Sequence, residues 1–333
     1  MGAMTPSDVK VGPVGWFSRR TALRMIGRGH RTRPGRAHGA LARLYRSRRR
    51  ADGALFWQAC RQGRGVAAAM VVPNPGRFGM LLYSPPGSDD VDVSALSTLL
   101  GRISAEACRR GLAFVQSLVH PAARADAAAL ESAGMIKLAE LVYMRLDLLV
   151  PGASAGPGVG AKDAADQAEW AWRPYERFSE SELGRAIAET YAGSLDCPLL
   201  VGVRQMSDVL AGHRASGTFR PSAWWLVERD GAPAGCILVN ASAVPRVAEV
   251  VYVGVSPAFR GCRLGRTMLL RAVRQAGTRK DRAITLAVDS RNTYALRMYA
   301  SVGFRRVFSR LAYISGPSHR LQTGRCRGNV NNL

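Results

Sequence analysis

The sequence repeats itself at a distance of about 168 residues, and this repeat constrains the fold more than any other feature. Aligned pairs occur in the same order along both copies, and one shift of offset separates them, as a small insertion in one copy would produce. The pairs are Phe56-Trp57 with Trp224-Trp225 and Gly63 with Gly231 at 168, then Leu100 with Leu269, Val115 with Ile284, Val119 with Val288 and Gly134-Met135 with Gly303-Phe304 at 169. We therefore expect two similar domains, at 51–149 and 169–314, which also suits the chain length of 333 residues.

Three further segments lack the composition of a packed domain. Residues 1–50 hold twelve arginines, one lysine and one acidic residue, about half of the net charge of +23, and predict a flexible basic arm. Residues 150–168 are small and rich in glycine and proline, which predicts a linker. Residues 315–333 show no apolar periodicity, so we expect a disordered tail.

The second block alternates between strand-like and helix-like patterns. Ser179 and Glu182 have the spacing of a capping box at a helix start, and the turn at 229–231 predicts a hairpin. This pattern predicts an α/β fold with helices on both faces of a mixed sheet. The expected strands are 170–175, 224–228, 234–239, 248–255, 284–288 and 304–314, and the expected helices are 179–192, 207–215, 264–277 and 293–302.

A basic, glycine-containing loop joins the strand at 248–255 to the helix that follows. The loop reads Arg260-Gly261-Cys262-Arg263-Leu264-Gly265-Arg266. Free N–H groups at a helix N-terminus and the helix dipole favour an anion. The glycines allow close approach of the backbone, and the arginines add positive charge. The expected ligand is a pyrophosphate.

This stretch resembles the acyl-CoA loop of the GNAT superfamily of N-acetyltransferases, Arg/Gln-x-x-Gly-x-Gly/Ala after a strand. The later run 292–299, followed by Gly303-Phe304, resembles the second half of the family pattern. The resemblance covers 169–314 well and 51–149 weakly. It implies tandem GNAT-like domains, each with a mixed, mostly antiparallel sheet flanked by helices. One departure is Arg263, which replaces the first glycine of the family loop.

The resemblance also implies roles for particular residues. Glu249 matches the general base that takes a proton from the amine, and Tyr299 the acid that protonates the leaving thiolate. Asn292 would contact the pantetheine arm and cap its helix, while the backbones of Val253 and Val255 would pair with the pantetheine amides. The alternatives are purely structural roles: an ion pair for Glu249 and packing in the core for Tyr299.

Two residues after the first helix of the second block are candidates for the acceptor pocket. In the family fold the region around Tyr191 and Asp196 borders that pocket, and Asp196 could hold a cationic acceptor. An ordinary turn aspartate remains the alternative.

The first block lacks these features. Arg77 aligns with Glu249, Leu130 aligns with Tyr299, and the acidic stretch Gly87-Ser88-Asp89-Asp90 replaces the basic loop. We expect a non-catalytic copy that supports the active domain or shapes the acceptor cleft.

The chain is therefore expected to be an acetyl-CoA-dependent N-acetyltransferase that acts on a small-molecule or peptide amine. The alternative is a nucleic-acid-binding protein on a vestigial acyltransferase fold, because of the Arg-rich arm. Dispersed cysteines and histidines predict neither a disulfide framework nor a metal site. The twin-arginine run at 18–23 lacks the apolar stretch that an export signal needs, so we expect a cytoplasmic protein. We also expect no membrane contact, and either a monomer or a homodimer. The acceptor and the acyl chain length stay open.

Overall fold

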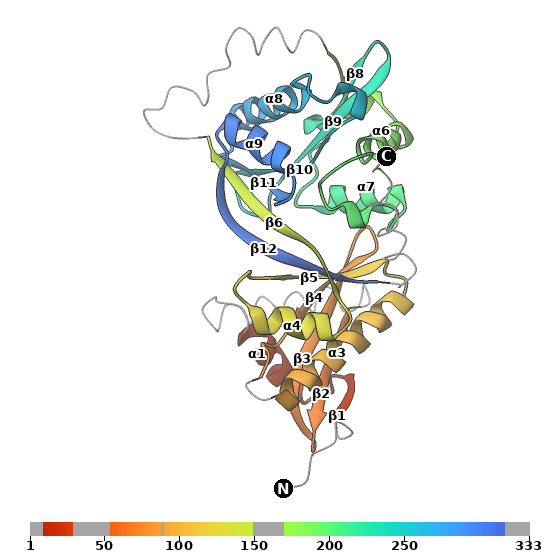
Figure 1. The fold of residues 1–333 in the computed structure, drawn as a ribbon, viewed down its shortest axis with the longest axis vertical. Coiled ribbons are helices and arrows are strands. Elements are labelled where there is room, and N and C mark those ends of the chain that lie inside the picture. Colours follow the sequence, from red (N-terminus) through yellow and green to blue (C-terminus); the bar gives the residue numbers. More distant parts are fainter. Residues whose placement is uncertain (1–8, 29–53, 88–89, 149–169, 317–333) are drawn as a thin grey trace, which may run out of the picture. The chain divides into compact units, whose positions relative to one another are not determined.

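The computed structural model describes residues 9–28, 54–87, 90–148 and 170–316, which form two compact units (Figure 1). Unit 1 takes Met1–Ala139 and Arg310–Leu333, and unit 2 takes Glu140–Ser309. The predicted linker 150–168 and the predicted tail beyond residue 316 lie outside the described residues.

Unit 2 is built on a mixed sheet with the strand order β6-β11-β10-β9-β8-β7. β10 and β11 run parallel, while the other neighbours pair antiparallel. The strands are β6 (Ile136–Asp147), β7 (Ala171–Pro174), β8 (Trp224–Arg229), β9 (Ala232–Ala241), β10 (Val247–Val255) and β11 (Ala283–Asp289).

Helices cover both faces of this sheet, as Figure 1 shows. One face packs against α8 (Leu264–Thr278) and α9 (Thr293–Val302), whose side chains join those of β9, β10 and β11 in one core. The opposite face packs against α6 (Glu180–Thr190) and α7 (Met206–Ala215). The predicted capping box is confirmed, because Ser179 and Glu182 bond each other's backbone N–H groups.

Unit 1 repeats the pattern with the order β1-β2-β3-β4-β5-β12. One face of the sheet packs against α3 and α4 and the other against α1. The elements are β1 (Val9–Pro13), α1 (Arg19–Arg28), β2 (Leu55–Arg61), β3 (Arg64–Asn74), β4 (Phe78–Tyr83), α3 (Asp90–Arg109), β5 (Phe114–Val119), α4 (Arg124–Ser132) and β12 (Arg305–Ser315).

The prediction of a flexible arm over residues 1–50 is wrong for the described part of that segment. β1 pairs antiparallel with β2, and α1 buries Ala22, Leu23 and Ile26 against β3. The arginines of α1 lie around this apolar stripe, so the high charge hid an amphipathic helix. These residues are the first strand and helix of unit 1.

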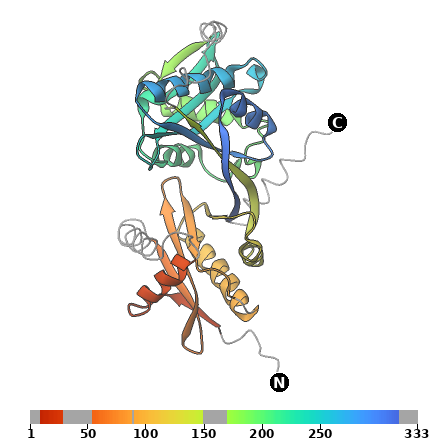
Figure 2. The same cartoon turned by 90° about the vertical axis from the view of Figure 1, so that its left-hand side faces the viewer.

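The predicted boundaries at 149 and 169 also need correction, because the last strand of each copy completes the sheet of the other unit. Residues of β6 up to Asp147 pair with Ala283–Asp289 of β11, and residues of β12 from Leu311 pair with β5. Both long strands can be followed from one unit into the other in Figure 2. Neither sheet is therefore made from one contiguous stretch of chain.

Within the described ranges, none of the helices is long and apolar enough to cross a membrane.

Candidate active site

β10 and β11 separate in the middle of unit 2. Their parallel pairing covers only Val247–Glu249 on β10 and Ala283–Thr285 on β11, although β11 continues to Asp289. On its other edge β10 stays paired with β9 as far as Val255, with a bulge between Val250 and Tyr252. The edge of β10 beyond Glu249 therefore lacks a ladder partner on the β11 side among the described residues, and it presents backbone groups to an extended ligand.

Glu249 lies at the point where the two strands separate. Its carboxylate is half-buried and accepts one long hydrogen bond, 3.5 Å from the Ser216 hydroxyl. Burial raises the pKa of Glu249, and the Ser216 bond opposes this only in part. No basic side chain of the described segments forms an ion pair with it. A carboxylate with a raised pKa and free acceptor capacity has the properties of a general base.

Tyr299 of α9 is 6% exposed and packs at a tilt against Phe304, with ring centroids 6.1 Å apart. In the part of the chain that the structure describes, its hydroxyl has no hydrogen-bond partner. Burial raises the pKa of Tyr299, and the Asp196 carboxylate acts in the same direction. The phenol therefore keeps its proton at neutral pH and can donate it.

The loop before α8 has the geometry of an anion site. Gly261 and Arg263 both have positive φ, +81° and +59°, and α8 begins at Leu264 with no side-chain cap and no acidic residue in its first turn. A helix that begins in this way can present its first N–H groups to an anion. Left-handed Arg263 costs about 1 kcal/mol relative to glycine, and its side chain is exposed.

Gly265 lets the start of α8 lie close to α9. A Cβ at this position would lie 2.8 Å from the sulfur of Met298 on α9. Leu264 turns its side chain into the core, so only its backbone faces the loop, and Cys262 is a free, exposed thiol. Arg266 is half-buried in the first turn of the helix.

Arg260 does not have the predicted environment of a phosphate ligand. Its guanidinium donates hydrogen bonds to the carbonyls of Thr190, Ala192 and Gly193, at the end of α6, and to the carbonyl of Val255. The loop pattern identified this arginine, but it did not reveal the carbonyls that bind it.

Asn292 is the N-cap of α9, as its position predicted. Its side-chain oxygen accepts a hydrogen bond of 3.1 Å from the Ala295 N–H. The contact with pantetheine stays a prediction.

The acceptor candidates lie beside this region. Tyr191 ends α6 and meets Tyr252 of β10 edge to face at 6.2 Å, and burial raises its pKa to about 12. Asp196 has an exposed surface, but protein atoms surround its carboxylate. The resulting loss of hydration raises the pKa of Asp196. One carboxylate oxygen accepts a 2.8 Å bond from the Asp289 N–H. Asp196 therefore fixes its loop to the end of β11.

Several polar residues here escaped the sequence analysis. The Tyr252 hydroxyl lies 2.5 Å from the Thr190 hydroxyl, and its ring lies 5.3 Å from the His213 ring. Nε2 of His213 is buried and finds no hydrogen-bond partner among the described residues. Burial, with a smaller effect of Arg204, lowers the pKa of His213 to about 4. Only the position of Tyr252, in the strand after Glu249, offered a signal in the sequence.

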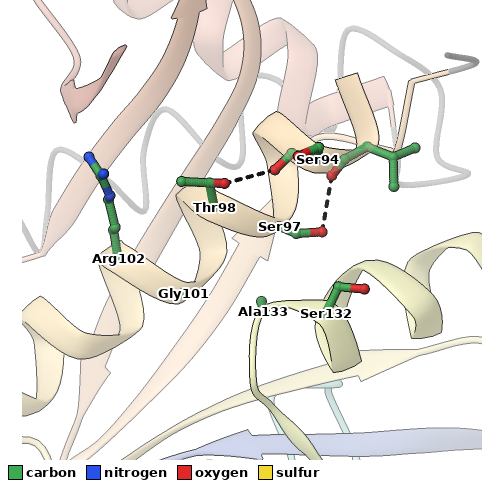
Figure 3. Close-up of a pocket in the computed structure, with 8 residues that line it drawn as sticks. Ser94, Ser97, Thr98, Gly101, Arg102, Ser132 and Ala133 are labelled. Carbon is green, nitrogen blue, oxygen red and sulfur yellow. Dashed lines mark hydrogen bonds between the residues drawn. The ribbon is translucent and has the colours of Figure 1, made fainter. Parts of the chain in front are cut away.

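Unit 1 has a hollow of about 540 Å³ between α3 and α4 (Figure 3). Its hydroxyls mostly serve their own helix: Ser97 donates to the Val93 carbonyl and Thr98 to the Ser94 carbonyl, each at 3.0 Å. Gly101 lets α3 approach the Ala133 carbonyl closely. None of the predicted catalytic residues lines this hollow.

Comparisons with known proteins agree with this geometry. Residues 169–304 match the acetyltransferase (GNAT) family. The whole chain is similar in fold to a GCN5-related N-acetyltransferase from Sphaerobacter thermophilus, with a TM-score of 0.57, 18% identity and coverage of 94% of this chain and 96% of that one. It is also similar in fold to a glucosamine N-acetyltransferase region of a fungal multi-domain GH3 β-N-acetylglucosaminidase. That match has a TM-score of 0.58 and 16% identity, and it covers 94% of this chain and 39% of that one. The chain therefore carries a GNAT acetyltransferase domain over residues 169–304.

Two relatives identified by sequence similarity share the name of one enzyme. A mycothiol acetyltransferase from Kineococcus radiotolerans is 28% identical over 317 residues, which are 85% of this chain and 95% of that protein. Another, from Thermomonospora curvata, is 36% identical over 110 residues, or 33% and 37% of the two chains. The protein is an N-acetyltransferase with acetyl-CoA as donor. The nucleic-acid alternative is not favoured.

Proposed function

We propose that Glu249 and Tyr299 carry the proton transfers of acetyl transfer to an amine. Acetyl-CoA supplies the acetyl group on a thioester. Glu249 takes a proton from the amine, which is protonated at neutral pH and must lose that proton to become nucleophilic. Tyr299 gives its proton to the departing thiolate, and because burial raises the pKa of Tyr299, the phenol is fully protonated when the thiolate leaves. The observation that carries this proposal is a half-buried carboxylate where β10 and β11 separate, together with a buried phenol on α9 that shares a core with these strands.

The donor would be held by the backbone of β10 and by the start of α8. Val253 and Val255 lie on the open part of β10, and the uncapped N–H groups after Arg263 suit a pyrophosphate. Arg263 and Arg266 supply positive charge nearby, while Gly261 and Gly265 keep the backbone accessible. The side chain of Asn292 would meet the pantetheine arm.

For the acceptor we propose the amine that becomes acetylated in mycothiol, because the relative that spans nearly the whole chain bears that name. Tyr191 and the neighbouring Tyr252, on the same strand as the base, offer hydroxyl groups that a polar acceptor would need. Unit 1 would serve as a non-catalytic support. A cytoplasmic location is supported by the described cysteines, which are all free thiols.

The test is the release of free coenzyme A thiol from acetyl-CoA in the presence of des-acetyl mycothiol and of a panel of other amines. We expect turnover with the mycothiol precursor to exceed that with the other amines, and both Glu249→Gln and Tyr299→Phe to reduce it. Turnover that survives both substitutions would remove these residues from the reaction. Equal rates across the panel would contradict the proposed acceptor.

A further inference from the structure

The guanidinium of Arg260 is bound to backbone carbonyls from a distant part of unit 2. Nη2 donates to Thr190 at 3.1 Å and to Ala192 at 2.6 Å, while Nη1 reaches Gly193 at 3.4 Å. Nε donates to Val255 at 3.3 Å. Every nitrogen of the group thus points to a carbonyl of the protein, which leaves little capacity for a phosphate.

The end of α6 has the chemistry that needs such a cation. The last carbonyls of a helix have no intrahelical partner, and the dipole places partial negative charge there. The last turn of α6 holds no basic residue of its own. Arg260 therefore supplies, from another element, a donor for the Thr190 carbonyl and positive charge at this helix end.

Gly193 leaves the space that the Arg260 guanidinium occupies. Its φ is +62°, and a Cβ on this residue would lie 3.2 Å from Nη1 of Arg260. Any larger residue would be strained in this backbone conformation and would press on the guanidinium.

The segment held by Arg260, residues 190–197, is here called the acceptor loop. At its start, the Thr190 hydroxyl meets the Tyr252 hydroxyl on β10. At its far end, Asp196 bonds to the Asp289 N–H. The acceptor loop is thus fixed to β10 and to β11, and Arg260 of the loop before α8 holds it at a third point.

The acceptor loop belongs to the same face of the sheet as the proposed base. Glu249 is the cross-strand neighbour of Asn240, so both side chains point to one face. Asn240 donates to the carbonyls of His213 and Ser216 at the end of α7, and Ser216 in turn reaches Glu249. An amine that meets the Glu249 side chain would come from this α6–α7 face, whereas α8 packs on the opposite face.

We propose that Arg260 is a positioning residue for the acceptor loop and that it determines acceptor binding, while Arg263 and the start of α8 determine donor binding. This inference rests on the proposed function. Two arginines three residues apart on one loop would then serve two different substrates.

The first experiment compares Arg260→Ala with Arg263→Ala in the full chain. Charge-assisted hydrogen bonds are the strong ones, so we expect Arg260→Ala to raise the KM for the amine by about tenfold or more. Its dissociation constant for coenzyme A, measured by calorimetry, should stay close to the wild-type value. Arg263→Ala should give the reverse result, with weaker coenzyme A binding and an unchanged acceptor KM.

A second variant approaches the same contact from the other side. Gly193→Ala should displace Arg260 and reproduce the rise in acceptor KM. In the double variant with Arg260→Ala, the two effects should not add, because both remove one interaction.

Hydrogen exchange gives a readout that does not depend on turnover. Ala192 and Ser194 donate their amide hydrogens within the turn, and these amides should exchange faster in Arg260→Ala but not in Arg263→Ala. Arg260→Ala with weakened coenzyme A binding, an unchanged acceptor KM and unchanged exchange at these amides would overturn the inference. Failure of the wild-type chain to bind coenzyme A would instead contradict the proposed function, and the exchange result would still decide the role of Arg260.

Discussion

The two copies in the sequence, which supply most of units 1 and 2, run through the same elements in the same order. β2, β3, β4, α3, β5, α4 and β6 of the first copy correspond to β8, β9, β10, α8, β11, α9 and β12 of the second. Matched apolar positions are buried in both units, as Leu100 and Leu269 or Val115 and Ile284 show. The repeat in the sequence is thus a repeat of the core.

The units differ where the chemistry lies. β10 carries Glu249 and a bulge, whereas the shorter β4 pairs regularly with β3 and begins after Arg77, a left-handed turn residue. Leu130 is fully buried where unit 2 has Tyr299. The two units keep the same sheet and core although only unit 2 has the candidate active-site residues. The fold therefore does not depend on those residues, which occupy only a few positions of the shared framework.

The largest loss of stability should come from removing the first copy from the chain. A fragment of residues 169–333 lacks β6, so β11 loses its pairing with residues 141–147, and Val142 and Met144 leave the core. We expect this loss to exceed a typical unfolding free energy of about 5–15 kcal/mol, and the fragment to be unfolded by circular dichroism.

The control keeps every described strand. A protease site placed between residues 150 and 168 of the full chain cuts the backbone but leaves β6 and β12 in place, so activity should survive cleavage. A folded, active 169–333 fragment would show that the strand exchange is dispensable.

Glu249→Gln should give the next largest effect, a fall in kcat/KM of about 100- to 10,000-fold, as expected for loss of a general base. Burial raises the pKa of Glu249, so wild-type activity should fall with decreasing pH at a value above the usual range of glutamate. The variant should lose this step.

The same variant tests stability. The pKa of Glu249 is higher in the folded chain than in the unfolded one, so charging it lowers the unfolding free energy as pH rises. Glu249→Gln should therefore be at least as stable as wild type at neutral pH. Arg77→Gln, its counterpart in unit 1, should leave kcat/KM unchanged, and a large loss there would break the comparison.

Tyr299→Phe should lower kcat by about 100-fold by removing the proton donor. Its raised pKa means that wild-type activity should not decline between pH 7 and about 10 through loss of the Tyr299 proton. The matched control is Tyr313→Phe in unit 1, which loses a 2.8 Å bond to Glu131. It should cost about 1 kcal/mol of stability without changing kcat, and a similar fall in kcat in both variants would make Tyr299 a packing residue.

The smallest effect concerns backbone strain. Arg263→Gly should gain up to about 1 kcal/mol in urea unfolding by relieving a left-handed arginine. Arg77 of unit 1 has a similar φ of +55°, but its Nε donates to the Gly111 carbonyl at 2.9 Å. Arg77→Gly should gain less, since it loses that bond. An equal or larger gain at Arg77 would show that its bond contributes nothing.

Much of unit 2 could be predicted from the sequence because its signals are local. The capping box at Ser179 and the N-cap at Asn292 depend on residues three positions apart, and the loop before α8 was recognised from consecutive residues. The hydrogen-bond partners of Arg260 and Asp196 could not be predicted, since they lie about 70 and 93 residues away.

By itself, the sequence determined a duplicated α/β chain with one basic loop, and it placed Glu249 and Tyr299 on their strand and helix. Only the tertiary structure decided that β6 completes one sheet and β12 the other, and that Val9–Pro13 and Arg19–Arg28 are parts of unit 1. The physical reason is that two copies with the same apolar alternation offer equivalent last strands. Periodicity shows which face of a strand is buried, but the choice of neighbour depends on contacts far apart in the chain.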